Sequence, residues 1–219
     1  RVPQARAGEG FEIRQGFLPL AVTLEPIADH GAAGDLAGDV GEAGEVFLDG
    51  QGTEVWEPRF VYHGFQYVEV TGLPDEPQGD TILGRVAHTA FRQAGVFECS
   101  NELFNKIQRN TLWSYVGNFH GYPTDCPHRE KNGWTGDAHL AAETGLYNFH
   151  SAAAYTKWMT DLKDEQRESG ELPGIVPTAG WGYAWGNGPA WDSAYVLIPW
   201  YLHLYRDDTR ILAEHYERF

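Results

Sequence analysis

The sequence predicts a β-rich region over residues 1–97 followed by an all-α region over residues 98–219, and two patterns carry this assignment. Before residue 98, short runs of β-branched and aromatic residues alternate with Gly, Pro and Asp, and no helical period occurs. After residue 98, apolar residues recur at helical spacing in successive segments. With 42% hydrophobic and 14% aromatic residues, the 219-residue chain is too apolar to be intrinsically disordered.

Apolar runs in the first region predict strands over residues 17–24, 45–48, 59–70 and 84–91. The run over residues 60–70 is the densest in β-branched and aromatic side chains, so we expect it to form a central strand of a β-sandwich. The stretch of Gly, Ala and Asp over residues 31–44 is expected to separate strands, as is the Pro-containing stretch over residues 73–77.

The second region is expected to hold five helical segments packed helix on helix. Ser100 and Ser151 are placed to cap the first and the third, and a segment over residues 138–149 fits between them. Asp192 and Asp208 precede the last two segments. We expect Pro199 to kink the fourth segment or to restart it, because proline removes a backbone donor.

The charge balance disfavours two classes of partner. The chain has 16 Lys and Arg against 31 Asp and Glu, a net charge of −15, which argues against nucleic acid or an anionic membrane surface. No run of 18 apolar residues predicts a membrane span. Cys99 and Cys126 are too few for a disulfide framework, so we expect reduced thiols, which slightly favours a cytoplasmic location.

Aromatic residues concentrate in the second region, where all but one of the 8 tryptophans lie between residues 113 and 200. Those on helical segments are expected in the core: Trp113, Trp158 and Trp200. The others of interest lie on a Gly-rich segment, residues 179–191, which we expect to be an irregular loop: Trp181, Trp185 and Trp191. Flat side chains on such a loop suit the apolar faces of sugar rings, as they suit other apolar ligands.

The densest polar segment, residues 123–137, is predicted to be a loop between the first two helices. It gathers three carboxylates and two cations: Asp125, Glu130 and Asp137, with Arg129 and Lys131. Two interpretations stay open. Asp137 could serve as the N-terminal charge of the next helix, with the other residues in a solvated ion-pair cluster. Alternatively, a carboxyl placed against Trp134 could serve as a general acid near neutral pH.

Neither a metal nor a cofactor is expected. His120, His128, His139 and His150 show no His-x-x-x-His spacing, and no cysteine joins them in a zinc pattern. His139 and Glu143 lie four residues apart, which is too small a set for a metal site. The sequence also lacks a Gly-rich phosphate loop, a nucleotide-binding fingerprint and a nucleophile elbow.

Several of these segments together resemble the bacterial α-L-rhamnosidases of glycoside hydrolase family 78. Asp-Cys-Pro-His-Arg-Glu at residues 125–130, followed by Gly-Trp-Thr-Gly-Asp at residues 133–137, is similar to the family's signature loop. Further matches occur in the family's order, in residues 56–60, 62–65, 99–101, 190–194 and 199–200. The resemblance therefore extends over about residues 45–219, on several separate motifs.

The resemblance implies β-sandwich domains followed by an (α/α)6 barrel, and removal of terminal α-L-rhamnose with inversion at the anomeric carbon. By position in the motif, Glu130 corresponds to the general acid. The substrate-binding residues would be Asp125 and Asp137, which hold the rhamnose hydroxyls, Arg129, and the aromatic walls Trp134 and Trp191. Departures from the usual motif occur at His128, at residues 131–132 and at Asp192, and leave the substrate detail open.

The resemblance also predicts an incomplete active site. An inverting hydrolase needs a general base about 6.5–9.5 Å from its acid. The family's base is a glutamate late in the barrel, which would lie beyond Phe219. The chain also begins at Arg1 rather than Met and ends within an amphipathic segment that has no C-cap. We therefore expect a fragment with about the first half of the barrel, without the base and inactive alone.

Two other functions stay open at the sequence level. One is a different (α/α)6 glycosidase or a polysaccharide lyase with the same carboxylates and tryptophans, and the other is a non-catalytic sugar-binding module. The expected partner is a rhamnose-containing glycoside or oligosaccharide. The sequence leaves open the aglycone, the linkage and self-association into a homo-oligomer.

Overall fold

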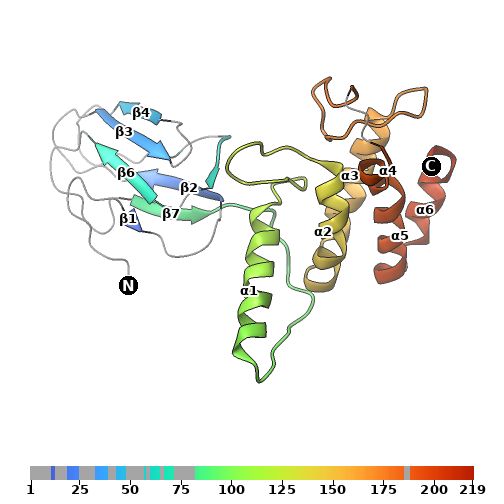
Figure 1. The fold of residues 1–219 in the computed structure, drawn as a ribbon, viewed down its shortest axis with the longest axis horizontal. Helices are drawn as coiled ribbons and strands as arrows, with labels where there is room; N and C mark the ends of the chain where they lie inside the picture. The colour runs from blue at the N-terminus through green and yellow to red at the C-terminus, as the bar shows by residue number, and fades with distance from the viewer. Residues whose placement is uncertain are drawn as a thin grey trace. The chain divides into compact units, whose positions relative to one another are not determined.

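The computed structural model describes residues 11–12, 19–24, 33–38, 43–47, 57, 60–64, 67–71, 82–184 and 188–219 (Figure 1). The chain divides into two compact units, Arg1–Ala87 with Pro127–Arg129, and His88–Cys126 with Glu130–Phe219. The domain boundary at residues 97/98 stays a prediction. Part of the family resemblance lies outside the described residues, at Trp56, Pro58, Arg59 and Phe65, and so does Trp185.

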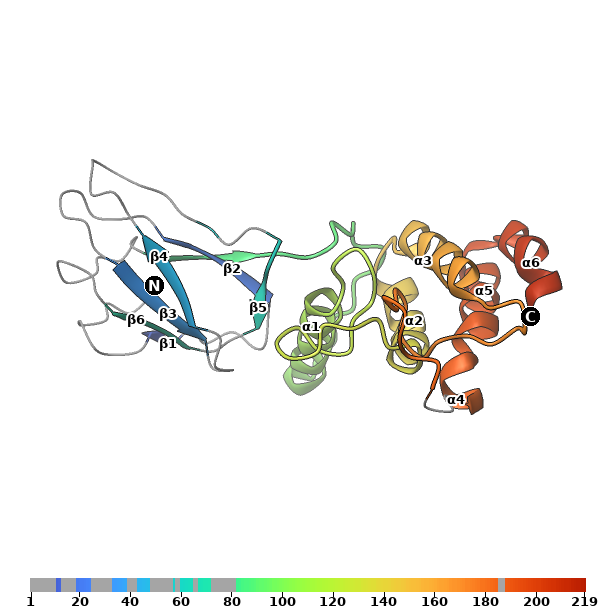
Figure 2. The same cartoon turned by 90° about the horizontal axis from the view of Figure 1, so that it is seen from above.

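The described strands of the first unit form two antiparallel sheets (Figure 1 and Figure 2). The four-stranded sheet has the order β1 (Phe11–Glu12), β6 (Tyr67–Thr71), β3 (Ala33–Gly38) and β4 (Ala43–Phe47). The three-stranded sheet has the order β5 (His63–Gly64), β2 (Pro19–Leu24) and β7 (Ile82–Val86). Strands β2, β4 and β7 overlap three of the predicted strands, which are confirmed to that extent.

The prediction of a single central strand over residues 60–70 is wrong. Phe60 has φ +61° and lies in a bend, β5 pairs with β2, and β6 pairs with β1 and β3 in the other sheet. The breaker prediction over residues 31–44 is also wrong, because this stretch contains β3 and the start of β4. Strand propensity indicates which residues suit a pleated surface, but sheet pairing can override it and decides which sheet they join.

The second unit contains six described α-helices and a terminal 3-10 turn, η1 (Tyr216–Arg218). The helices are α1 (Glu102–Gly117), α2 (Thr135–Asn148), α3 (Ala152–Glu165), α4 (Gly188–Asp192), α5 (Ala194–Arg206) and α6 (Thr209–His215). Helix α5 packs against α2, α3 and α6, and α1 contacts α2, so the predicted packing of helix on helix is confirmed (Figure 1 and Figure 2). No described helix is both long and apolar enough to span a bilayer.

The helix boundaries follow the predicted caps only in part. The Ser151 side chain makes no capping hydrogen bond at the start of α3, and Asp192 is the last residue of α4 instead of the cap of α5, so both of these predictions are wrong. The Asp208 side chain accepts a hydrogen bond from the Ile211 N–H at 3.2 Å, as expected of a cap at the start of α6. At the start of α1, Asn101 rather than Ser100 is the cap, and its side chain accepts from the Leu103 N–H at 3.0 Å. Helix α5 continues through Pro199 without restarting, because its buried face, which includes Ile198 and Pro199, stabilises it by packing.

The core of the helical unit includes Trp158, which is fully buried as predicted. The core prediction is wrong for Trp113 and Trp200, whose exposed fractions are 44% and 48%. Helical spacing identifies an apolar face, whereas burial also needs a partner on that face, and the described residues leave these two side chains open to solvent. Both cysteines are free thiols, as predicted.

Candidate active site

Short-range hydrogen bonds hold the polar loop between α1 and α2. The Asp125 N–H donates to the Asn132 carbonyl oxygen, and the Asn132 N–H donates to Asp125 Oδ1, both at 3.0 Å. The Glu130 N–H donates to Cys126 Sγ at 3.2 Å. These bonds join residues four to seven positions apart, so the loop presents Glu130 on a backbone that its own neighbours hold in place.

A second segment, residues 172–178, anchors the end of this loop. The Val176 N–H donates to the Gly133 carbonyl oxygen at 2.8 Å, and Trp134 and Ile175 form an isolated antiparallel bridge. A Cβ on Gly133 would lie 1.9 Å from the Val176 carbonyl oxygen, so only glycine permits this approach. The Trp158 indole N–H donates to the same carbonyl oxygen at 2.9 Å, which links the segment to the buried face of α3.

Three predicted site residues are brought together around Trp134. Its indole N–H donates to Glu130 Oε2 at 2.8 Å. Its ring meets that of Trp191 edge-on, with centroids 6.5 Å apart and planes at 67°. Trp191 is 37% exposed and packs against Gly136, where an added Cβ would lie 2.9 Å from the Trp191 indole nitrogen.

The placement of Trp191 corrects one sequence prediction. Residues 179–191 are not irregular throughout, because α4 covers the end of the segment. The His139 Nε2–H on α2 donates to the Ala190 carbonyl oxygen at 2.8 Å, which holds α4 beside α2. On the same helix, Glu143 accepts a hydrogen bond from the Tyr205 hydroxyl of α5. His139 and Glu143 therefore join helices, and the described residues contain no cluster of three or more His, Cys, Asp or Glu suited to a metal.

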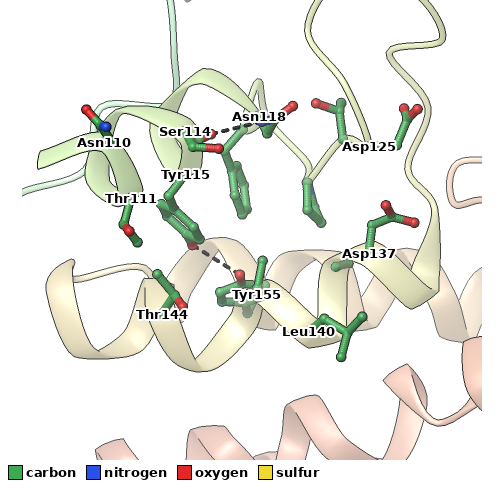
Figure 3. A pocket seen from close by; sticks show the side chains of 15 residues that line it. Asn110, Thr111, Ser114, Tyr115, Asn118, Asp125, Asp137, Leu140, Thr144 and Tyr155 are labelled. Carbon is green, nitrogen blue, oxygen red and sulfur yellow. Dashed lines mark hydrogen bonds between the residues drawn. The ribbon is translucent and has the colours of Figure 1, made fainter. Parts of the chain in front are cut away.

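Asp125 and Asp137 lie at one end of a pocket of about 600 Å³ between α1 and α2 (Figure 3). Elsewhere the Tyr115 hydroxyl donates to the Tyr155 hydroxyl at 3.1 Å in the pocket wall. The lining also includes Thr124, whose Oγ1 is buried without a partner among the described residues. The two carboxylates give this end of the pocket polar groups that can bind a hydroxyl-rich ligand.

The other two carboxylates of the loop act on Asp137. Partial burial raises the pKa of the Asp137 carboxyl above its usual range, and the negative charges of Asp125 and Glu130 raise it further. Asp137 also lies in the first turn of α2, so its interpretation as an N-terminal helix charge holds together with its place in the cluster. The ion-pair interpretation is incomplete, because it does not include the contact between Trp134 and Glu130.

The structure thus places five of the six predicted site residues in the helical unit: Glu130, Trp134, Trp191, Asp125 and Asp137. Arg129 belongs to the first compact unit, and its role stays a prediction. Sequence reasoning missed the support given by Asn132, Cys126 and residues 172–178. The sequence does carry a signal for the segment at residues 172–178, because two prolines, Pro173 and Pro177, flank the short apolar pair at residues 175–176.

Comparisons with known proteins point to one family. Residues 92–219 match the family described as bacterial alpha-L-rhamnosidase 6 hairpin glycosidase domain, and residues 24–88 match the bacterial alpha-L-rhamnosidase concanavalin-like domain. An alpha-L-rhamnosidase of Formosa agariphila is 36% identical over 93% of this chain and 23% of its own length. One from Streptomyces avermitilis is 43% identical over 76% of this chain and 16% of its own length.

Solved structures give the same result. The alpha-L-rhamnosidase from Dictyoglumus thermophilum matches with a TM-score of 0.87 and 36% identity, over 95% of this chain and 25% of that one. The Streptomyces avermitilis alpha-L-rhamnosidase complexed with L-rhamnose matches with a TM-score of 0.87 and 32% identity, over 99% of this chain and 23% of that one. The chain spans a quarter or less of the length of these relatives.

Proposed function

This chain belongs to the bacterial α-L-rhamnosidases of glycoside hydrolase family 78, and from that membership we propose that it forms part of an enzyme that removes terminal α-L-rhamnose from rhamnosides. The observation that carries the proposal is the Glu130 carboxyl hydrogen-bonded to the Trp134 indole, beside Asp125 and Asp137. A carboxyl held against an aromatic ring, with further carboxylates near it, is typical of a site that cleaves a glycosidic bond.

Each site residue has a role in this mechanism. Glu130 donates a proton to the glycosidic oxygen, and the rings of Trp134 and Trp191 line the apolar face of the sugar. Asp125 and Asp137 accept hydrogen bonds from rhamnose hydroxyls. Because Asp125 Oδ1 already accepts from the Asn132 N–H, its other oxygen is the one that faces the ligand.

The mechanism is inverting, and its general base lies outside this chain. In an inverting hydrolase the base activates a water on the face of the sugar opposite the acid, about 6.5–9.5 Å away. A glutamate from a later part of a longer polypeptide supplies the base, so residues 1–219 alone are inactive. Arg129 adds a substrate contact from the signature loop.

The proposed architecture is a β-sandwich followed by the first half of an (α/α)6 barrel. The two antiparallel sheets support the first part, and the packing of α2, α3, α5 and α6 supports the second. Large apolar side chains are exposed on α2 and α5, including Leu140 at 77% and Leu204 at 54%. In a complete barrel, later helices would cover such side chains.

The test is a panel of aryl glycosides offered to the full-length polypeptide that contains this chain, with residues 1–219 alone as the control. We expect release of L-rhamnose only from the α-L-rhamnoside and only by the full-length protein, with the β anomer as the first product in NMR spectra. Release of another sugar would indicate a different glycosidase, and an unsaturated product would indicate a lyase. Sugar binding without turnover would indicate a binding module. Each of these three results contradicts the proposal.

A further inference from the structure

We propose that Trp134 is a positioning residue for the acid proton of Glu130, a role beyond that of an aromatic wall, and this inference rests on the proposed function. The indole N–H of Trp134 is a donor only, and it points at Glu130 Oε2 from 2.8 Å. Of the two Glu130 carboxyl oxygens, the one that accepts this hydrogen bond carries negative charge more favourably. The protonated oxygen of a carboxylic acid is the weaker acceptor of a hydrogen bond. The acid proton therefore resides on Oε1.

Backbone contacts hold both partners of this hydrogen bond. The Trp134 N–H donates to the Asn132 carbonyl oxygen at 2.9 Å, and the backbone of Trp134 forms a bridge with Ile175. The Glu130 N–H donates to Cys126 Sγ at 3.2 Å. With both backbones held, the hydrogen bond from the Trp134 indole N–H to Oε2 limits rotation of the Glu130 carboxyl, so that its two oxygens do not exchange roles during a turnover.

The hydrogen bond acts during proton transfer. Glu130 Oε1 gives its proton to the glycosidic oxygen as the bond from that oxygen to the anomeric carbon breaks, and the bonding electrons stay with the leaving oxygen. Glu130 becomes a carboxylate, whose charge the Trp134 N–H stabilises at Oε2. Hydrogen bonds to ionised groups are stronger than neutral ones, so this bond strengthens as the transition state is reached.

The leaving group distinguishes this role from a structural one. A p-nitrophenolate leaves with little protonation, whereas an alkoxide leaves only after it receives a proton. In the full-length protein, Trp134→Phe keeps an aromatic face toward the sugar and removes the donor. We expect kcat to fall for methyl α-L-rhamnoside by a factor about ten times, or more, the factor for the p-nitrophenyl substrate. A hydrogen bond to a charged group stabilises by enough free energy to account for a rate effect of about this size. KM should change similarly for both substrates.

The matched control is Trp191→Phe, which removes an indole from the same aromatic pair. The described residues give Trp191 no hydrogen bond to Glu130, so this variant should slow both substrates by a similar factor. If Trp134→Phe fails to fold, replacement of Trp134 by benzothienylalanine keeps the ring shape and exchanges only the N–H for sulfur. The same selective loss on the methyl rhamnoside is expected.

The outcomes separate this inference from the function on which it rests. If wild-type protein releases rhamnose from neither substrate, the proposed function is wrong, and the inference is wrong with it. If wild type cleaves both substrates and the Trp134 variants slow both equally, Trp134 has a structural or wall role and only the inference is overturned.

Discussion

Gly145→Ala tests a close approach of α1 and α2 in the helical unit. An added Cβ would lie 2.1 Å from the Tyr115 hydroxyl oxygen and 2.3 Å from the ring carbon that bears it. Tyr115 is itself buried, stacks on Phe149 at 5.3 Å and donates to the Tyr155 hydroxyl at 3.1 Å. The methyl group therefore cannot be accommodated unless the Tyr115 ring moves and gives up that hydrogen bond.

The size of the effect follows from three contributions to the free energy of unfolding. Overpacking a core site destabilises by about 1–3 kcal/mol. Leaving the buried Tyr155 hydroxyl without its donor costs about 1–3 kcal/mol more. Replacing glycine by alanine within a helix returns about 0.5–1 kcal/mol. The net expectation is a loss of roughly 1–5 kcal/mol in the stability of the helical unit.

Urea unfolding, monitored by circular dichroism, measures this loss in the free energy of unfolding. In a double-mutant cycle, Tyr115→Leu removes the ring that the new methyl group would meet, so Gly145→Ala should cost much less in that background. Equal or greater stability of Gly145→Ala in the wild-type background would refute the described packing of α1 on α2.

Three further predictions concern the loop, the pocket and the buried histidine. Gly133→Ala should abolish rhamnose release by the full-length protein while circular dichroism shows unchanged helix content, because its Cβ would lie 1.9 Å from the Val176 carbonyl oxygen and displace Trp134. Asp137→Asn should raise the urea midpoint at neutral pH, because burial and neighbouring carboxylates raise the pKa of the Asp137 carboxyl and so disfavour its ionised form in the folded protein. The same variant should weaken L-rhamnose binding in calorimetry, because it removes a carboxylate that accepts hydrogen bonds from the sugar. Burial lowers the pKa of His215, so the unfolded chain takes up a proton below about pH 6.5 that the folded chain resists, and stability should fall as the pH drops below that value. Urea unfolding of His215→Gln above and below about pH 6.5 should show a weaker dependence of stability on pH than in wild type. An unchanged dependence would contradict the role of His215.

Much of the candidate site could be predicted because its residues are close in the sequence. Glu130 and Trp134 are four positions apart in one loop, so their contact needs only a compact turn. The loop was identified from its prolines, glycines and carboxylates, all of which are local signals. Trp191 is distant in sequence, and its approach to Gly136 depends on α4, which the Gly-rich sequence did not predict.

The β unit was harder to predict for the opposite reason. The residues of β3 are poor strand formers, and their pairing with β4 and β6 comes from partners elsewhere in the chain. The run over residues 60–70 contains two strands that belong to different sheets. The strand preferences of single residues do not show where the chain passes from one sheet to the other. Similarly, amphipathic spacing placed Trp113 and Trp200 on apolar faces but did not show whether anything covers them.

The central claim is that Glu130 donates the proton that breaks the rhamnosidic bond. The most direct measurement is turnover of methyl α-L-rhamnoside by the full-length Glu130→Gln variant, together with its affinity for L-rhamnose. A general acid contributes about 10²–10⁴-fold, so turnover should fall by at least about 100-fold while L-rhamnose affinity stays close to wild type. Turnover near the wild-type rate in a folded, rhamnose-binding Glu130→Gln variant would contradict the account.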